Sequence, residues 1–498
     1  MNKTINKTSF ASSLIVFISL ILALLVAIIA ILVSNFYNKK QSKSFDTVLF
    51  ITIDTLRKDH VSAYGYPYKI TPFIDKLAEN GTQFNNAYTV SSHTAPSHTS
   101  MFTGLYPFRH KVLRNYDALS NDIYNINKHF LKNGFKTVGF PATTFLEGKV
   151  SFKDEREKYN DIVKAVGRVG WFLSAKQNIA RARAWFENEV ESSDKVFMWL
   201  HLYDAHQWQK IGRLDKKYID FANNLKKDET YFKFLTENHN IPISFYNSKD
   251  EMLTKISTYD AKIKMIDDEL LSFFNFLNEK RGKGNILIVL ISDHGEGLGN
   301  HYYDSHGKYL YNEQLEIPLI FWSNNGTIPK KRENALISSI DVFATVADLV
   351  NIPLSKEEFL NQNGKSYKDI VLRSGKSSYN SSYNSSYKSN YNEKRDYVIS
   401  ERRPKDDAAL RKSWISGNVF SVLDGKYKYI YNEKAKDEFY DLQKDAFELE
   451  NKIDDEKNLV KLYDKKLSYE VRKFETHKLE NQGLTKKEIN ELKALGYL

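Results

Sequence analysis

The chain has 498 residues, a formal net charge of +10 and no cysteine, with a pI near 9.1 and a mean hydropathy of −0.50. The length suffices for one large domain and a smaller one, whereas the hydropathy excludes a polytopic membrane protein and the lack of cysteine excludes disulfides and thiolate metal sites. The lysines are spread along the chain without a long basic block or a nucleic-acid-binding motif, so we expect no nucleic-acid partner.

Residues 10–33 are apolar apart from three serines and form a run long enough to cross a membrane. We expect an uncleaved single-pass anchor, with residues 1–9 as a cytoplasmic N-terminus before it and residues 34–45 as a tether after it. A cleaved signal peptide is the alternative, but the run is longer than the apolar region of such a peptide and no Ala-x-Ala motif follows it. Lysines flank the run on both sides, so the charge distribution does not set its orientation.

Three apolar, β-branched runs further along have the pattern of strands buried on both faces of a parallel sheet. Each is followed by polar side chains: Val48–Ile53 by Asp54, Val196–Leu200 by His201, Asp204 and His206, and Ile286–Ile291 by Asp293 and His294. Ligands of open α/β sheets bind outside the carboxyl ends of the strands. The recurrence of acidic residues at these ends therefore predicts a site there, although a single Asp at such a place is more often a helix cap or a turn residue.

Helical patterns alternate with these strands. "TPFIDKLAENG" has a proline near its start and a glycine after its end, and "KISTYDAKIKMIDDELLSFFNFLNEKRG" carries apolar residues at helical spacing. We therefore expect a doubly wound α/β domain, a sheet flanked by helices, over residues 46–352.

The remaining residues, 353–498, have the pattern of a small α+β subdomain. The stretch "SSYNSSYNSSYKSNYN" is of low complexity, and we expect a disordered insertion over residues 374–393. After it, "YVISE", "VFSVLDGKYKYIYN" and "EFYDL" predict short antiparallel strands with a hairpin turn at Asp424-Gly425, and Lys/Glu-rich helical segments follow.

The stretch "SSHTAPSHTSMFTG" predicts a loop leading into a helix that begins near Pro96 or Ser97. The unpaired N–H groups of that helix start would face an anion bound beside Thr94, and His98 would add a donor. A threonine hydroxyl needs a base or a metal to become nucleophilic. Asp54, Asp293 and His294 could hold a divalent cation against it, an arrangement suited to phosphoryl or sulfuryl chemistry.

These residues resemble the sulfatase family of the alkaline phosphatase superfamily. The resemblance rests on "VLFITIDTLRKDH…TPFIDKLAENGTQFNNAYTVSSHTAPSHTSMFTGLYPFRH" and on "HLYDAH", "YDAKIKMIDDEL", "SDHGEGLGNH", "HGKYLYNEQLEIPLIFW", "SSIDVFATVADLVNIP" and "EFYDLQKDAFELENK" in the same order. It implies an alkaline-phosphatase-like fold, Asp54, Asp293 and His294 as metal ligands, and Thr94 at the place of the nucleophile and in the ligand set. It also implies that the anchored domain lies outside the cytoplasmic membrane.

Several positions depart from the family pattern. Usual sulfatases have Cys or Ser in a C/S-x-P-x-R signature that matures to formylglycine, whereas this chain has "TAPSH", with His98 in place of the arginine. We therefore expect no formylglycine. Thr55 stands where a second acidic ligand usually follows the first, and the Gly-Lys-Trp-His segment that contacts sulfate has no counterpart. A ligand set of one acid, Thr, Asp and His is similar to that of the phosphoglycerol and phosphoethanolamine transferases, which usually carry several membrane spans.

The sequence thus predicts a membrane-anchored hydrolase of sulfate or phosphate esters with a Thr nucleophile and one divalent cation (Ca, Mg or Mn). Alternatives are phospho-transfer to envelope lipids or glycans, and a binding protein that has lost catalysis. We expect His98, His206 and His306 to contact the oxyanion or protonate the leaving group, and Lys308 and Asp204 to bind substrate. His201, His110 and His301 are expected to be structural, and the Asp204 to His206 spacing does not favour a second metal.

Overall fold

The computed structural model describes residues 20–22, 24–29, 45–144, 146–148, 150, 152, 164, 172–209, 214–282, 284–373, 394–403 and 417–481. Two units make up the chain, Met1–Phe45 and Asp46–Leu498. The expected insertion over residues 374–393 lies outside the described residues.

In the first unit the structure describes Phe45 and residues 20–22 and 24–29. The latter two ranges are helical, and their large apolar side chains are exposed. Most of the expected span over residues 10–33 lies outside the described residues. Among the residues that are described, no helix combines the length and the apolar character that crossing a membrane requires.

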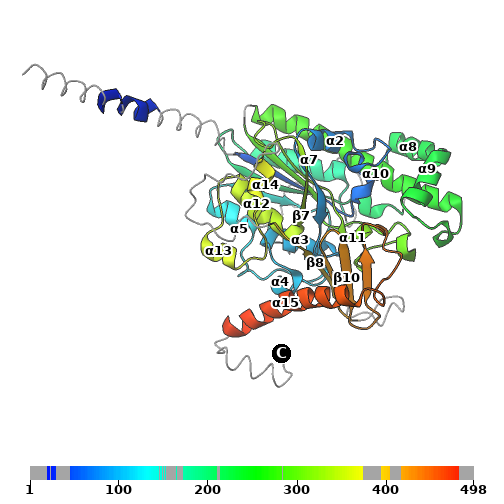
Figure 1. Cartoon of the computed structure of the whole chain (residues 1–498). Coiled ribbons are helices and arrows are strands. Elements are labelled where there is room, and N and C mark those ends of the chain that lie inside the picture. Colours follow the sequence, from blue (N-terminus) through cyan, green and yellow to red (C-terminus); the bar gives the residue numbers. More distant parts are fainter. Residues whose placement is uncertain are drawn as a thin grey trace, which may run out of the picture. The chain divides into compact units, whose positions relative to one another are not determined.

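A seven-stranded sheet forms the centre of the second unit, in the order β3-β4-β1-β5-β6-β2-β7 (Figure 1). The strands are β1 (Thr47–Ile53), β2 (Thr82–Tyr88), β3 (Lys136–Phe140), β4 (Val196–Leu202), β5 (Ile286–Ser292), β6 (Leu319–Ser323) and β7 (Lys331–Ser338). The three predicted strands are the neighbours β4, β1 and β5, which are parallel and buried along their whole length. The prediction that their carboxyl ends share one edge of the sheet is confirmed.

The sheet as a whole is mixed, whereas the sequence pattern predicted parallel pairing for the three apolar strands and gave no direction for the others. β6 runs antiparallel to both of its neighbours, β5 and β2. The chain between β5 and β6 contains only short helical turns, η6 (Asn300–Tyr302) and α11 (Asn312–Leu315), and so has no crossover helix to return it to the other edge. β6 therefore starts at the edge where β5 ends and runs in the opposite direction.

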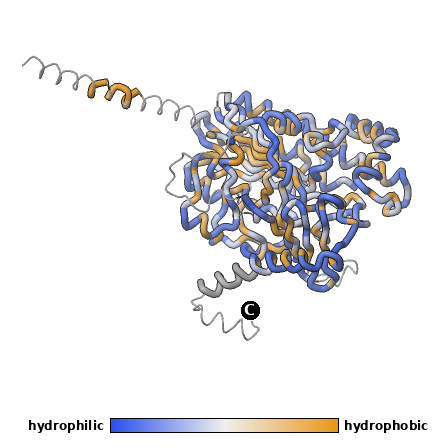
Figure 2. Tube along the Cα trace, in the orientation of Figure 1, coloured by the Kyte–Doolittle hydropathy of each residue, from blue (hydrophilic) through white to orange (hydrophobic). Residues whose placement is uncertain are grey.

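Helices cover both faces of this sheet (Figure 1). On one face α2 (Pro72–Glu79), α7 (Ala175–Glu189) and α10 (Lys249–Arg281) pack on alternate residues of β1. On the other face α3 (Thr94–Thr103) and α5 (Ile126–Lys132) contribute aromatic rings. Phe102 of α3 lies 5.8 Å from Phe50 of β1, and Phe130 of α5 lies 4.3 Å from Phe197 of β4. Further α-helices among the described residues are α4 (Pro107–His110), α8 (Lys216–Lys226), α9 (Glu229–Lys233), α12 (Val342–Leu349), α13 (Lys356–Leu360) and α14 (Lys368–Leu372). Figure 2 shows hydrophobic residues gathered along the central strands.

The predicted C-terminal α+β region is a four-stranded antiparallel sheet in the order β11-β10-β9-β8 with one long helix. Its elements are β8 (Val398–Arg402), β9 (Val419–Leu423), β10 (Tyr427–Asn432), β11 (Glu438–Asp441) and α15 (Lys457–Asn481). Tyr463 and Leu467 of α15 pack on the sheet. Gly425 has a φ of 88°, which suits the hairpin turn predicted between β9 and β10.

This small sheet contacts the segment that leads into α3. Ser400 Oγ of β8 donates a hydrogen bond to the carbonyl of Thr89 over 2.6 Å, and the Glu401 N–H donates to the carbonyl of Val90 over 2.8 Å. The segment that precedes Thr94 is therefore held by the C-terminal sheet.

Helix α3 begins at Thr94, two residues before the predicted start. His93 has extended backbone angles, φ −120° and ψ 141°, and is the N-cap, so Thr94 is the first helical residue. Pro96 fits the first turn because the N–H that proline lacks would have no partner within the helix there.

Candidate functional site

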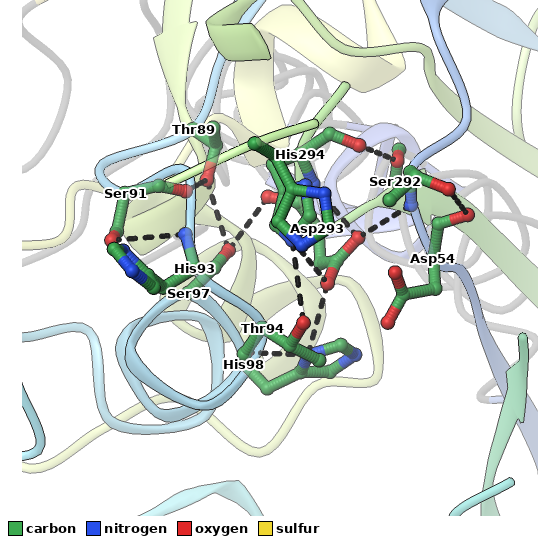
Figure 3. A network of polar contacts seen from close by, with 12 residues as sticks. Asp54, Thr89, Ser91, His93, Thr94, Ser97, His98, Ser292, Asp293 and His294 are labelled. Carbon is green, nitrogen blue, oxygen red and sulfur yellow. Dashed lines mark hydrogen bonds and ion pairs between the residues drawn. The ribbon is translucent and has the colours of Figure 1, made fainter. Parts of the chain in front are cut away.

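The candidate site lies at the carboxyl ends of β1 and β5. Asp54 directly follows β1, Asp293 and His294 directly follow β5, and Thr94 faces them from the first turn of α3 (Figure 3). Ligand atoms of Asp54, Asp293 and His294 all lie within 4.8 Å of one another, and the three residues are buried. The structure thus brings together the four residues that the sequence pointed to as ligands and nucleophile.

Asp54 is held by a histidine that the sequence analysis assigned a structural role. Asp54 Oδ2 lies 3.3 Å from His201 Nε2, and the Ala142 N–H donates to His201 Nδ1 over 3.1 Å. His201 therefore carries its proton on Nε2 and donates it to Asp54. Burial lowers the pKa of His201 to about 4, so the ring is neutral near pH 7.

Asp293 is fixed by backbone N–H groups on one oxygen only. Its Oδ1 accepts from the Thr55 N–H over 3.1 Å and from the His294 N–H over 2.8 Å. Thr55 reaches this position in a left-handed conformation, φ 56°, while its own hydroxyl donates to the carbonyl of Asp54. Thr55 thus contributes its backbone rather than its side chain to the site.

The ring of His294 is oriented by its own neighbour. His294 Nδ1 donates to the carbonyl of Gly295 over 2.9 Å, which turns Nε2 towards Thr94 Oγ1 at 3.3 Å and Asp293 Oδ2 at 3.4 Å. Although burial opposes its charged form, the Asp293 and Asp54 carboxylates raise the pKa of His294.

These residues fit a divalent cation. Asp54 Oδ1 and Asp293 Oδ2 are buried and have no hydrogen-bond partner, and burial raises the pKa of Asp54 to about 7. Each of these two buried carboxylates thus has one oxygen without a hydrogen-bond partner, and the two negative charges repel one another. A cation bound between them would remove that repulsion. Oxygen donors with one imidazole nitrogen suit Mg²⁺, Mn²⁺ or Ca²⁺.

Thr94 itself is 2% exposed and lies at the N-terminus of α3. The N–H of Ala95, next to it, already donates to Asn115 Oδ1 over 3.0 Å. Fewer helix N–H groups than expected therefore remain to face an anion beside Thr94.

His98 lies below Thr94, with both ring nitrogens engaged. Nδ1 is 2.9 Å from the carbonyl of Thr94 and Nε2 is 3.0 Å from Thr52 Oγ1, which also accepts from Trp199 Nε1 over 2.9 Å. Burial lowers the pKa of His98 to about 3. A catalytic role for His98 stays a prediction, and these contacts favour a role in positioning Thr94.

His306 and His206 lie beside the ligands. The His306 ring centroid is 4.4 Å from that of His294 and 4.8 Å from that of His206. His306 Nδ1 is 3.2 Å from Glu296 Oε1, and the Glu296 carboxylate also accepts from Trp208 Nε1. Burial lowers the pKa of His206 well below its ordinary value and raises that of Glu296 to about 8.

The two predicted substrate-binding residues have different surroundings. Asp204 Oδ2 accepts from the Ala175 N–H over 2.6 Å, a contact at the first residue of α7. This bond favours a helix-capping role over substrate binding. The Lys308 ammonium lies 4.6 Å and 5.4 Å from the ring centroids of Tyr309 and Tyr303.

Three residues of the site were not among the predicted functional residues: His201, Glu296 and Thr52. His201 lies inside β4, which extends to Leu202, and a polar residue within such an apolar run was a signal of a buried hydrogen bond. Glu296 lies three residues after Asp293, so its closeness to the end of β5 was a signal of a place in the site. No feature of the sequence around Thr52 indicates that it belongs to the site.

Comparison with known proteins finds one matching family model and several similar proteins. The family model described as "Sulfatase" matches residues 46–352. The chain is 23% identical over 442 residues to the uncharacterized sulfatase YidJ of Escherichia coli (strain K12), covering 82% of this chain and 83% of that protein. It is 24% identical over 524 residues to the multifunctional alkaline phosphatase superfamily protein PehA of Trinickia caryophylli, covering 88% of this chain and 98% of that protein.

A solved structure has the same fold. The phosphonate monoester hydrolase of Agrobacterium radiobacter superposes with a TM-score of 0.62 at 17% identity, covering 84% of this chain and 94% of that one. The α/β architecture expected from the sequence is therefore confirmed.

Proposed function

The chain belongs to the sulfatase family and is a sulfatase-like ester hydrolase, and from that premise we propose that Thr94 is its nucleophile and acts with one divalent cation. Its substrates are sulfate or phosphate esters. The observation that carries the proposal is the position of Thr94 Oγ1, 3.3 Å from His294 Nε2 and facing the Asp54 and Asp293 carboxylates (Figure 3).

Asp54, Asp293 and His294 would hold the cation. Bound there, it would favour the alkoxide form of Thr94 and attract the charged oxygens of the ester. The Thr94 hydroxyl gives up its proton and Oγ attacks the sulfur or phosphorus, while the bond to the leaving oxygen breaks and that oxygen takes up a proton. The oxygen of water or of an acceptor hydroxyl then attacks the same sulfur or phosphorus and loses its proton. The bond to Thr94 Oγ breaks in this step, and Oγ is protonated again.

We propose that His306 gives a proton to the leaving oxygen. Its Nδ1 is held by the buried Glu296 carboxylate at 3.2 Å, which orients the ring so that Nε2 is the atom that exchanges a proton. His206, next to His306, completes this side of the site.

The test compares wild type with Thr94→Ala and Thr94→Ser, after folding is checked by circular dichroism. Each protein is assayed with p-nitrophenyl sulfate, p-nitrophenyl phosphate and a p-nitrophenyl phosphonate, after EDTA treatment and after addition of Mg²⁺, Mn²⁺ or Ca²⁺. We expect cation-dependent turnover that the alanine variant loses and the serine variant partly keeps. Equal turnover by Thr94→Ala and wild type would overturn the proposal.

Transfer to an acceptor is the second candidate, because Thr94 is an unmodified hydroxyl. Its ester has no second hydroxyl on the same carbon that could expel the bound group, so an outside hydroxyl must attack. Turnover in the presence of glycerol or a sugar, with the products separated by mass, distinguishes hydrolysis from transfer. A product that carries the group on the added alcohol favours transfer to envelope lipids or glycans.

We also propose that residues 10–33 anchor the enzyme with its catalytic domain outside the cytoplasmic membrane. The support is the length and apolar character of that run. Protease treatment of intact cells should degrade the domain, and membranes washed with carbonate should retain the full chain. Recovery of the full chain in the soluble fraction would contradict the anchor.

A further inference from the structure

A cavity lies where α2 and the last turns of α10 meet the end of β6. Its volume is about 320 Å³, which is within the size range of small-molecule sites. Four of its lining side chains are apolar: Phe73, Leu77, Phe274 and Trp322. None of them takes part in the Thr94 centre, so the cavity is a separate place on the second unit.

The apolar wall of this cavity is part of the main core. Phe73, Leu77 and Phe274 are buried there, and Trp322 packs against them while only partly buried. The ring centroids of Phe73 and Phe274 are 5.2 Å apart, and those of Phe274 and Trp322 are 5.1 Å apart. The wall is therefore formed before any ligand arrives, with one indole at its rim.

Two lysines complete the rim. Lys76 of α2 and Lys330, which follows β6, line the cavity and are exposed. Within the described part of the chain neither forms an ion pair, whereas the next lysine, Lys331, is paired with Glu333 over 3.4 Å. None of the described residues that line the cavity is acidic. An apolar wall with two cations at its edge is complementary to a ligand that joins an apolar chain to a negative group.

The cavity lies beside the point where the second unit begins. Asn324, one of its lining residues, donates from Nδ2 to the carbonyl of Gly284 and accepts at Oδ1 from the Ile286 N–H, both over 2.8 Å. Asp46, the first residue of the unit, donates its N–H to the carbonyl of Asn285 over 3.1 Å. Asn324 and Asp46 thus bond to the same short stretch of backbone.

The proposed anchor therefore brings this cavity close to a membrane surface. The tether over residues 34–45 spans about 40 Å when fully extended and about 20 Å as a flexible chain. Tryptophan and lysine are side chains suited to the boundary between headgroups and acyl chains, where an indole ring and a long apolar stem are accommodated together with polar atoms. Membrane lipid is thus the nearest source of a ligand with an acyl chain and a negative group.

We propose that this cavity binds an anionic phospholipid of the membrane that holds the chain. An acyl chain lies against Phe274 and Trp322, and Lys76 and Lys330 contact the phosphate. The inference goes beyond the proposed ester hydrolysis and rests on the proposed anchor.

Lipid bound in this cavity would orient the enzyme. Strand β1 begins at Thr47, next to Asp46, and its seven residues end at Ile53, next to Asp54, a length of about 20 Å. The Thr94 centre therefore lies at the far end of this strand from the lipid, where it is open to substrates outside the membrane.

The test measures the fluorescence of Trp322 in the full chain reconstituted into vesicles, because bromine on an acyl chain quenches a tryptophan that it touches. The vesicles are phosphatidylcholine with about 20% phosphatidylglycerol, the anionic lipid. One set carries bromine on the phosphatidylglycerol, and the other carries the same amount of bromine on the phosphatidylcholine. Trp322→Phe gives the signal of the other tryptophans, which is subtracted.

The charge is tested with the double variant Lys76→Gln/Lys330→Gln, which leaves the apolar wall intact. Lys426→Gln/Lys434→Gln is the matched control, because it changes the net charge equally. Lys426 and Lys434 lie in the turns of the C-terminal sheet and are exposed, and neither has an ion pair among the residues that the structure describes.

We expect bromine on phosphatidylglycerol to quench Trp322 of wild type about three times more than bromine on phosphatidylcholine. The ratio should fall to about one in Lys76→Gln/Lys330→Gln, since each lysine near an anionic surface adds to the attraction, and it should stay unchanged in the control. Equal quenching by the two lipids in wild type, or the same loss in the control, would overturn the site.

Two more measurements separate this inference from the earlier proposals. Ester turnover on the same vesicles reports the catalysis, so turnover without a lipid preference means that the lipid site alone fails. Flotation of the vesicles reports the anchor. If the chain does not float, dihexanoyl phosphatidylglycerol is titrated below its micelle concentration. A blue shift of Trp322 emission that Lys76→Gln/Lys330→Gln loses then supports the cavity without the anchor, and no shift overturns it.

Discussion

At the scale of single residues, the proton on His98 is set by a tryptophan. Trp199 Nε1 can only donate, so Thr52 Oγ1 must accept its hydrogen and donate its own to His98 Nε2. His98 therefore carries its proton on Nδ1 and donates it to the carbonyl of Thr94. A chain of three hydrogen bonds thus runs from Trp199 to the backbone of Thr94.

Thr52→Val should break this chain without changing the size of the side chain. The Trp199 N–H and His98 Nε2 then lose their partner in a buried place, and we expect kcat to fall by about 10- to 100-fold and stability to fall by about 1–3 kcal/mol. Thr52→Ser keeps the hydroxyl and should retain most of both. Initial rates and urea unfolding measure the two effects, and a valine variant as active as the serine variant would contradict the chain.

With the cation removed, the Asp54 and Glu296 carboxyls should destabilise the fold increasingly as pH rises. Burial raises the pKa of Asp54 from 3.8 to about 7 and that of Glu296 from 4.5 to about 8. Between its ordinary and its raised pKa, each carboxyl holds a proton in the cation-free fold that the unfolded chain has released, so its contribution to the free energy of unfolding decreases with increasing pH.

A bound cation takes the place of the proton on Asp54, so the gain in Tm on adding Mg²⁺ or Mn²⁺ after EDTA should be larger at pH 8 than at pH 5. Thermal melts at both pH values measure the gain. Asp54→Asn serves as the control and should lose most of it. A gain that is the same at both pH values would argue against the coupling.

The sequence pointed to Asp54, Asp293 and His294 because each follows an apolar run, and strand ends can be recognised without a structure. It did not assign His201 to the site, since that residue lies within β4 and its contact with Asp54 is made across two strands. The surroundings of Asp204 and His98 were also not predictable from the sequence. The bond of Asp204 to Ala175 and that of His98 to Thr52 depend on packing between segments far apart in the chain.

At the scale of elements, the segment between β5 and β6 packs tightly on the residues before α3. Gly307 has a φ of 81°, and an added Cβ would lie 2.6 Å from His93 Nε2. The close approach keeps His306 against His294. Glycine is favoured at this position for two reasons: it adopts a positive φ readily, and it has no side chain to clash with His93.

Gly307→Ala should displace the His93 ring and lower kcat by a larger factor than its loss of stability explains. Gly326→Ala is the matched control, because Gly326 also has a positive φ, 72°, but nothing within 4 Å of an added Cβ. Both variants pay about 1 kcal/mol of backbone strain, and only the first has the clash. Equal kcat values in the two variants would show that the contact has no role in the site.

Elements were predictable where their pattern is local. The strands β1, β4 and β5, the helices α2 and α10 and the C-terminal hairpin follow from periodicity and turn residues, and all of them are present. The direction of β6 was not predictable from the sequence, because it depends on the edge of the sheet at which the strand begins. The start of α3 was not predictable either, because it depends on the extended backbone of His93.

At the scale of the whole molecule, the C-terminal sheet and the large sheet are joined by buried polar contacts. Arg395, just before β8, makes a two-bond ion pair with Asp341, whose side chain is fully buried, at 2.6 Å and 2.5 Å. The bonds from β8 to Thr89 and Val90 are a second connection, which joins the small sheet to the segment before Thr94.

Arg395→Gln should leave Asp341 buried without its partner and cost about 3–5 kcal/mol. Lys436→Gln is the control, because both side chains of the Lys436–Asp454 ion pair are exposed. Loss of that pair should lower the free energy of unfolding by less than about 1 kcal/mol. Scanning calorimetry should show a single transition for residues 46–498 that moves to lower temperature. Two separate transitions in wild type would show that the small sheet unfolds independently.

The neutral imidazole of His98 also bears on how such a chain could change during evolution. A cysteine or serine at Thr94 together with an arginine at His98 would give the C/S-x-P-x-R pattern, but arginine offers donors only. The Thr52 hydroxyl would then lose its acceptor, and Trp199 Nε1 would still donate to it. A change to that pattern by single substitutions therefore passes through intermediates with unmatched buried donors, so Thr52 and Trp199 restrict which residue can stand at position 98.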